Sequence, residues 1–107
     1  MNAIVTGATK GIGRAIVLHL AANNYNVALC ARNEQQVKKL LQELSESYPE
    51  LHFYGMAADM ENLSEVASFA AFADKHFNNA DVLINNAGLF IPSGLIKEEA
   101  TALERQM

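Results

Sequence analysis

The sequence predicts an α/β fold in which helices cover both faces of a parallel β-sheet. Short apolar runs, typical of strands buried on both faces, alternate with segments that repeat apolar residues at helical spacing. Strands that alternate with helices at short intervals form parallel units with right-handed crossovers. Half of the 107 residues are hydrophobic and 19% are charged, which indicates one soluble domain with a buried core.

The first two expected strands lie near the N-terminus. A run with β-branched residues at 3–6 stops at Gly7, and residues 27–31 are apolar throughout, as in a strand covered on both faces. A helix beginning at Gly11 is expected between them, with the Asn23-Asn24 pair as its stop. The apolar face expected for this helix consists of Ile12, Ala15, Ile16 and Leu20.

Two capping boxes predict the starts of the next two helices. Asn33 with Gln36 precedes a helix that ends at Pro49, and Asn62 with Glu65 precedes a helix closed by Asn78-Asn79. The apolar stripe expected for the first of these is Val37, Leu40, Leu41, Leu44 and Tyr48. The face expected for the second is Leu63, Val66, Ala70, Ala73 and Phe77.

Two more strands complete the expected pattern. Residues 51–57 form a third strand between the capped helices, and residues 81–84 form a fourth. A loop through Gly88, Pro92 and Gly94 follows, and a final helix is expected from about Lys97. The fourth strand is apolar, as an interior strand is, so the fold is expected to continue beyond Met107.

Composition and charge argue against several classes of function. Twelve acidic against eight basic residues give a net charge of −4 without a basic run, which argues against nucleic acid or a membrane surface as a partner. No apolar stretch reaches the ~18 residues of a membrane span, and no signal peptide is expected. The unpaired Cys30 favours buried packing and a cytoplasmic location. No metal site is expected, because the histidines lack ligand spacing: His19, His52 and His76.

Three segments that follow expected strands carry chemistry. Thr6-Gly7-Ala8-Thr9-Lys10-Gly11-Ile12-Gly13 connects the first strand to the first helix. Glycines here allow a sharp turn and let a pyrophosphate approach the first helical amides, whose dipole favours an anion. Asp59 follows the third strand, and Asn85-Asn86-Ala87-Gly88 follows the fourth. Each has a bland alternative: a turn without a ligand for the glycine and asparagine segments, and a loop aspartate near a helix start for Asp59.

The three segments, in this order, resemble those of the short-chain dehydrogenase/reductase family over the whole chain. The resemblance implies a Rossmann-type, doubly wound parallel sheet, of which residues 1–107 would be the NADP-binding first half with strand order 3-2-1-4. It implies that Asp59 accepts a hydrogen bond from the adenine amino group, and that Ala87 and Gly88 admit the nicotinamide-side ribose. The expected cofactor-binding residues are Gly7, Thr9, Lys10, Gly11, Ile12, Gly13, Arg32, Asn33, Asp59, Met60, Asn86, Ala87 and Gly88.

The end of the second strand predicts NADP(H) rather than NAD. An NAD site of this type usually places an acid there, but this chain has Ala31 followed by Arg32, whose guanidinium can clamp a 2′-phosphate. Lys10 adds a positive charge where the family's NADP-binding members have a basic residue, and Asn33 can donate to the same phosphate. The alternative is that Arg32 and Lys10 are solvated surface charges. Glu34 fits stabilisation of the helix start better than binding of a ribose.

The residues that carry out this family's reaction, a Ser, a Tyr-x-x-x-Lys and an Asn, cannot be placed in the chain. The residues four positions after Tyr25, Tyr48 and Tyr54 are Leu29, His52 and Ala58, so residues 1–107 contain no Tyr-x-x-x-Lys. No catalytic residue is therefore assigned here, and residues 1–107 alone are expected to be inactive.

Two functions remain open at this point. The resemblance implies an NADP(H)-dependent oxidoreductase that interconverts a small-molecule carbonyl and alcohol by hydride transfer, similar to reductases of 3-oxoacyl thioesters and ketones. At full length such a protein is expected to form a dimer or tetramer. The alternative is a non-catalytic module that binds NADP(H) or assembles with another chain across the fourth strand.

Overall fold

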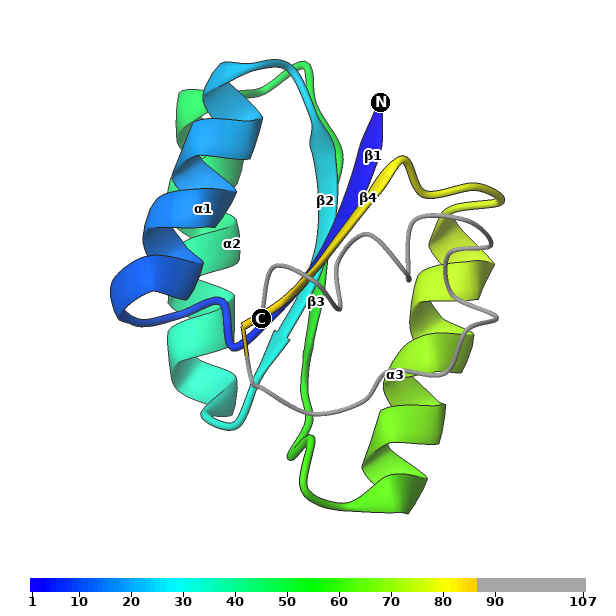
Figure 1. Cartoon of the computed structure of the whole chain (residues 1–107). Coiled ribbons are helices and arrows are strands. Elements are labelled where there is room, and N and C mark those ends of the chain that lie inside the picture. The colour runs from blue at the N-terminus through cyan, green and yellow to red at the C-terminus, as the bar shows by residue number, and fades with distance from the viewer. Residues whose placement is uncertain (87–107) are drawn as a thin grey trace.

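A computed structural model describes residues 1–86 as a four-stranded parallel sheet with three helices (Figure 1). The strand order is β3-β2-β1-β4, which confirms the expected 3-2-1-4 arrangement. In chain order the elements are β1 (Asn2–Thr6), α1 (Gly11–Ala22), β2 (Asn26–Ala31), α2 (Glu34–Ser47), β3 (Phe53–Ala57), α3 (Leu63–His76) and β4 (Val82–Asn85). The loop expected through Gly88 and the helix expected from Lys97 lie outside the described residues.

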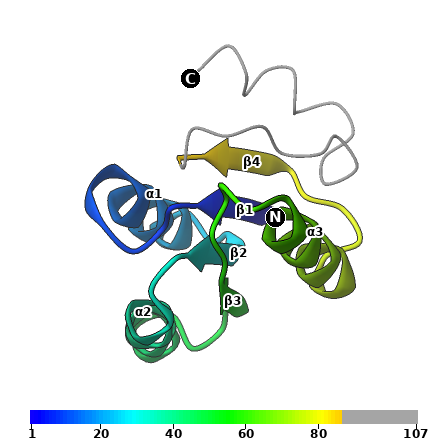
Figure 2. The ribbon, with the colours of Figure 1, turned by 90° about the horizontal axis from the view of Figure 1, so that it is seen from below.

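The helices form a layer on each side of the sheet, with α1 and α2 on one face and α3 on the other (Figure 2). Side chains of successive strand residues point to opposite faces, so β1 contributes Ile4 to the core beneath α3 and Val5 to the core beneath α1 and α2. Both side chains are buried, which explains why the central strands are apolar throughout.

The helix boundaries follow the signals expected from the sequence. The Asn33 side chain accepts a hydrogen bond from the backbone N–H of Gln36 at 3.0 Å, and the Asn62 side chain accepts from Ser64 and Glu65. After α1, Asn24 adopts a φ of 66°, the left-handed conformation that asparagine tolerates at a helix stop. Within residues 1–86, no helix has both the length and the apolar character needed to cross a membrane.

The predicted apolar face of α1 is wrong by one position. The buried residues are Gly13, Val17 and Ala21, whereas Ile12 is 72% exposed and Ala15 is also exposed. The buried face runs through Gly13, which packs against the loop after β1 and which, having no side chain, adds nothing to a hydrophobic periodicity. Ile16 and Leu20 are partly buried beside the true stripe.

The stripe of α2 is confirmed, whereas one residue of the predicted α3 face is wrong. Leu63 is 86% exposed, and the buried face of α3 begins at Val66 and continues through Phe69 and Ala73. Leu63 is the first residue of the helix, directly after the Asn62 cap, and this first turn places no side chain in the core before Val66. Phe69, which the predicted face omitted, is fully buried.

Candidate functional site

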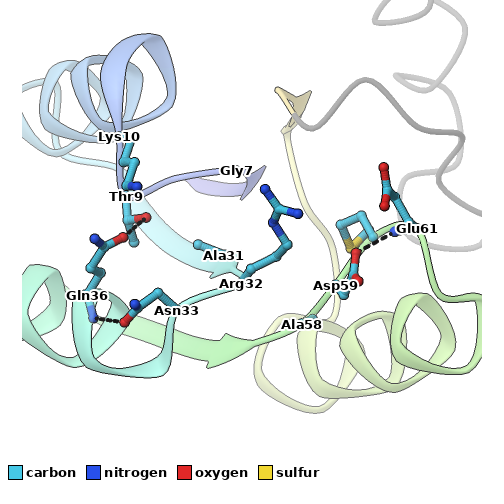
Figure 3. A pocket seen from close by; sticks show the side chains of 11 residues that line it. Gly7, Thr9, Lys10, Ala31, Arg32, Asn33, Gln36, Ala58, Asp59 and Glu61 are labelled. Carbon is cyan, nitrogen blue, oxygen red and sulfur yellow. Dashed lines mark hydrogen bonds between the residues drawn. The ribbon is translucent and has the colours of Figure 1, made fainter.

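A cleft of about 300 Å³ lies at the carboxyl ends of β1, β2 and β3 (Figure 3). In a parallel α/β sheet this is the edge where ligands bind. Its walls come from the loop after β1, the start of α2 and the segment after β3. The lining residues are Gly7, Thr9, Lys10, Ala31, Arg32, Asn33, Gln36, Ala58, Asp59, Met60 and Glu61.

The loop between β1 and α1 makes two turns that favour glycine. Gly7 has a φ of 64° and Gly11 a φ of 53°, both in the left-handed region that other residues adopt only with strain. A Cβ atom on Gly11 would meet nothing within 4 Å, so backbone conformation rather than space selects glycine there. Lys10 occupies the N-cap position of α1 and its side chain makes no capping hydrogen bond. The first amides of α1 therefore have no side-chain cap from this residue.

Gly13 lets three segments meet behind the loop. A Cβ atom at Gly13 would lie 1.9 Å from the Gly7 carbonyl oxygen and 2.8 Å from Nδ2 of Asn86. That Nδ2 donates a hydrogen bond to the same Gly7 oxygen at 3.1 Å. The glycine loop, the first turn of α1 and the end of β4 are thus held together where any side chain on residue 13 would separate them.

A buried hydrogen bond joins the ends of β1 and β4. Oγ1 of Thr6 donates to Oδ1 of Asn85 at 2.8 Å, and the two residues are also partners in the strand register. Both are buried, with 0% and 5% of their surfaces exposed. Asn85 thus ties neighbouring strands through its side chain.

The positive charge of the cleft comes from Lys10 and Arg32, and its negative charge comes from Asp59 and Glu61. Ala31 ends β2 and is 7% exposed, so its small side chain offers no acceptor where an acid would stand. Figure 3 shows Lys10 and Arg32 projecting from neighbouring segments at this end of the sheet. Among residues 1–86, neither of these cations is paired with an acid. Two free cations beside an alanine suit an anionic ligand group.

The opposite wall is organised by hydrogen bonds around Asp59. Its Oδ1 accepts from the backbone N–H of Glu61 at 2.9 Å, and its own N–H donates to Oε1 of Glu65 at 3.0 Å. Glu65 therefore leaves the reciprocal half of its capping box unmade and holds this loop instead. The Oδ2 atom of Asp59 has no hydrogen-bond partner within residues 1–86, which leaves it available to a donor in the cleft.

The cleft gathers most, but not all, of the residues predicted from the sequence. It brings together Gly7, Thr9, Lys10, Arg32, Asn33, Asp59 and Met60. Gly11, Ile12, Gly13 and Asn86 lie at the start of α1 and after β4 and do not line it, and Ala87 and Gly88 lie outside the described residues.

Gln36 and Glu61 line the cleft but were not predicted as site residues. The signal for Gln36 was present: it is the third residue of a helix whose start follows a strand end. The sequence pattern itself predicts only a capping role for this residue.

Cys30 packs beneath the cleft and takes no part in it. Its Sγ contacts Sδ of Met60 at 3.7 Å, and burial raises the pKa of the thiol from 9.0 to about 12, although a hydrogen bond with the Gly7 backbone lowers it. The thiol is therefore protonated at neutral pH, and the residue is buried strand packing, as expected. No cluster of three or more potential metal ligands occurs in the part of the chain that the structure describes.

The chain is similar in sequence to known reductases. (−)-Isopiperitenone reductase of Mentha piperita is 42% identical over 91 residues, which cover 81% of this chain and 28% of that protein. A 3-oxoacyl-acyl-carrier-protein reductase of Staphylococcus aureus is 34% identical over 89 residues, covering 82% of this chain and 35% of the relative. The chain thus spans about a third of the length of these relatives.

A solved structure shares the fold. L-Sorbose reductase of Gluconobacter frateurii, in complex with NADPH and L-sorbose, superposes with a TM-score of 0.76 at 28% identity, over 82% of this chain and 33% of that one. The family of short chain dehydrogenases matches residues 1–107. The α/β sheet, the glycine loop and this match over the whole chain together show that the protein belongs to the short-chain dehydrogenase/reductase family of oxidoreductases.

Proposed function

We propose that this chain is the NADP(H)-binding part of an oxidoreductase that interconverts a carbonyl and an alcohol by hydride transfer. The observation that carries the proposal is that Lys10 and Arg32, which have no acidic partner among residues 1–86, lie with Ala31, at the end of β2, in the cleft that also holds the glycine loop. A 2′-phosphate is favoured by such cations, and a free ribose hydroxyl finds no acid there to accept its hydrogen bond.

The residues fit the cofactor on the chemistry of their polar groups. When bound, NADP(H) supplies the hydride. Arg32, Lys10 and Asn33 would hold the 2′-phosphate, and the glycine loop before α1 would hold the pyrophosphate. The Oδ2 atom of Asp59, which has no hydrogen-bond partner among the described residues and lies on the opposite wall, would accept from the adenine amino group.

The rest of the proposal concerns the whole protein. Residues 1–107 would be the first part of a larger domain whose later residues supply the Ser and Tyr-x-x-x-Lys. The similarity to (−)-isopiperitenone reductase and to a 3-oxoacyl-acyl-carrier-protein reductase supports a small carbonyl compound as substrate. The family resemblance supports a dimer or tetramer, and the unpaired, buried Cys30 is consistent with a cytoplasmic location.

The experiment is a reduction assay on the natural gene product, whose intact mass is measured first. We expect a mass well above 11.7 kDa and oxidation of NADPH, seen as loss of absorbance, with at least one member of a panel of ketones and 3-oxoacyl thioesters. Residues 1–107 expressed alone serve as a control and should show no turnover. Turnover by the short chain would contradict the assignment of the catalytic residues to a later segment.

The second candidate is a non-catalytic NADP(H)-binding or assembly module. It is favoured by the lack of a Tyr-x-x-x-Lys in residues 1–107. A natural gene product of 11.7 kDa that binds NADPH without reducing any ketone would support this candidate and contradict the first.

A further inference from the structure

One hydrogen bond directly links the two segments of the cleft that carry cations, the loop with Lys10 and the segment that runs from Arg32 into α2. Oγ1 of Thr9, in the loop between β1 and α1, donates to Oε1 of Gln36, in the first turn of α2, at 3.2 Å. The two residues are 27 positions apart, and the contact is partly buried. Figure 3 shows the pair bridging from the glycine loop to α2 at one side of the cleft.

Gln36 makes this contact instead of a local one. As the third residue after the Asn33 cap, it occupies the position whose side chain, in a complete capping box, accepts from the N–H of the cap residue. Only the other half of the box forms, in which the Gln36 N–H donates to Oδ1 of Asn33 at 3.0 Å. The Gln36 carboxamide is thus diverted from the helix start to the glycine loop.

The contact fixes residues that carry the positive charge. Thr9 precedes Lys10, and Gln36 is bonded to Asn33, which follows Arg32. The link therefore sets the spacing between the segment of Lys10 and the segment of Arg32. A binding group is effective when surrounding residues hold it in the productive geometry before the ligand arrives.

We propose that Gln36 is a positioning residue: by holding the Thr9 hydroxyl, it keeps the glycine loop and the Arg32–Asn33 segment at the spacing that favours a 2′-phosphorylated cofactor. This inference rests on the proposed NADP(H) function. Loss of the link loosens the cationic side of the cleft, whereas Asp59 and its loop are held separately by Glu65. The effect falls on NADPH more than on NADH, because only NADPH places a phosphate between the linked segments.

The test compares dissociation constants for NADPH and NADH, measured by titration of the complete protein, in Gln36→Ala, Thr9→Val and the double variant. Each single variant should weaken NADPH binding about threefold to tenfold, which is the effect of one lost hydrogen bond, and should weaken NADH binding less than about twofold. The double variant should bind NADPH as tightly as the single variant with the larger loss, since both changes remove the same hydrogen bond. Thr9→Ser, which keeps the hydroxyl, should keep the preference for NADPH.

Gln35→Ala is the matched control, because Gln35 is an exposed residue of the same type in the same helical turn. It should leave both affinities unchanged. Equal losses for NADPH and NADH in Gln36→Ala, with a parallel fall in melting temperature, would overturn the proposal in favour of a purely structural role. Additive losses in the double variant would also overturn it.

Failure of this inference differs from failure of the proposed function. If Arg32→Ala removes the preference for NADPH while Gln36→Ala and Thr9→Val retain it, the positioning role alone is wrong. If the unmodified protein shows no preference for NADPH, the proposed cofactor is wrong and the positioning role falls with it.

Discussion

The Cβ position of Gly13 lies 1.9 Å from the carbonyl oxygen of Gly7, so the backbone of the loop occupies the space that any side chain at residue 13 would need. The oxygen is in turn held by Nδ2 of Asn86. Gly13 is therefore selected by close packing between helix and loop, and Gly11 by its positive φ. The spacing of the glycines follows from two different physical requirements.

Gly13→Ala should displace the loop from α1, and Gly13→Val should do so further. We expect lower melting temperatures and loss of binding for both NADPH and NADH, since the loop serves the part that the two cofactors share. Gly55→Ala is the control for overpacking away from the loop: its new Cβ would lie 2.9 Å to 3.1 Å from side-chain atoms of Val37, Leu29 and Leu41, so it should lower the melting temperature without a selective loss of cofactor binding. Unchanged cofactor affinity in Gly13→Val would show that this loop does not hold the cofactor.

Thr6→Val should destabilise the fold because it leaves a buried acceptor without its donor. The change keeps the shape of the side chain but removes the donor to Oδ1 of Asn85, which stays 5% exposed. We expect a loss of about 1–3 kcal/mol in the free energy of unfolding, measured by urea denaturation. Ser45→Ala, at an exposed position on α2, should change it by less than about 0.5 kcal/mol. A loss in Thr6→Val no larger than this control would show that the strand-to-strand bond adds no stability.

Cys30 should make stability fall at alkaline pH. The pKa of its thiol rises from 9.0 in the unfolded chain to about 12 in the fold, so above pH 9 the unfolded state releases a proton that the folded state retains. The stabilisation is complete below pH 9 and declines as the pH rises towards 12. Urea denaturation from pH 8 to 11 should show a shallower decline in Cys30→Ala than in the unmodified protein. Parallel declines would contradict a buried, neutral thiol.

The native thiol should also react slowly. At pH 8 a thiol reagent should modify Cys30 only at the rate of unfolding, and urea should accelerate the reaction greatly, because burial keeps the thiol protonated. Rapid modification of the folded protein at pH 8 would mean that the β2 environment is open to solvent.

The sequence predicted the sheet because its signals are local. The Asn33 and Asn62 caps, the Asn24 stop and the apolar central strands each act within a few residues, and the structure confirms them. The clustering of the glycine loop, Arg32 and Asp59 also followed from the sequence, since the carboxyl ends of parallel strands share one edge.

Two errors arose where contacts are long-range. The buried face of α1 includes Gly13, which lies against Gly7, rather than Ile12, and hydrophobic periodicity cannot register a residue without a side chain. The hydrogen-bond partner of the Gln36 side chain lies 27 residues away, so a local capping rule predicted the wrong partner for it. Both errors concern how elements pack, which depends on three-dimensional proximity.

The most direct test of the proposed cofactor is the ratio of NADPH to NADH affinity before and after Arg32→Ala, in the complete protein. We predict that the unmodified protein binds NADPH more tightly. The substitution should weaken NADPH binding by about tenfold to a hundredfold, which is the effect of lost charge-assisted hydrogen bonds, and NADH binding by less than about threefold. Lys39→Ala, which removes an exposed cation on α2, should change neither. Equal losses for both cofactors in Arg32→Ala would contradict recognition of a 2′-phosphate by this cleft.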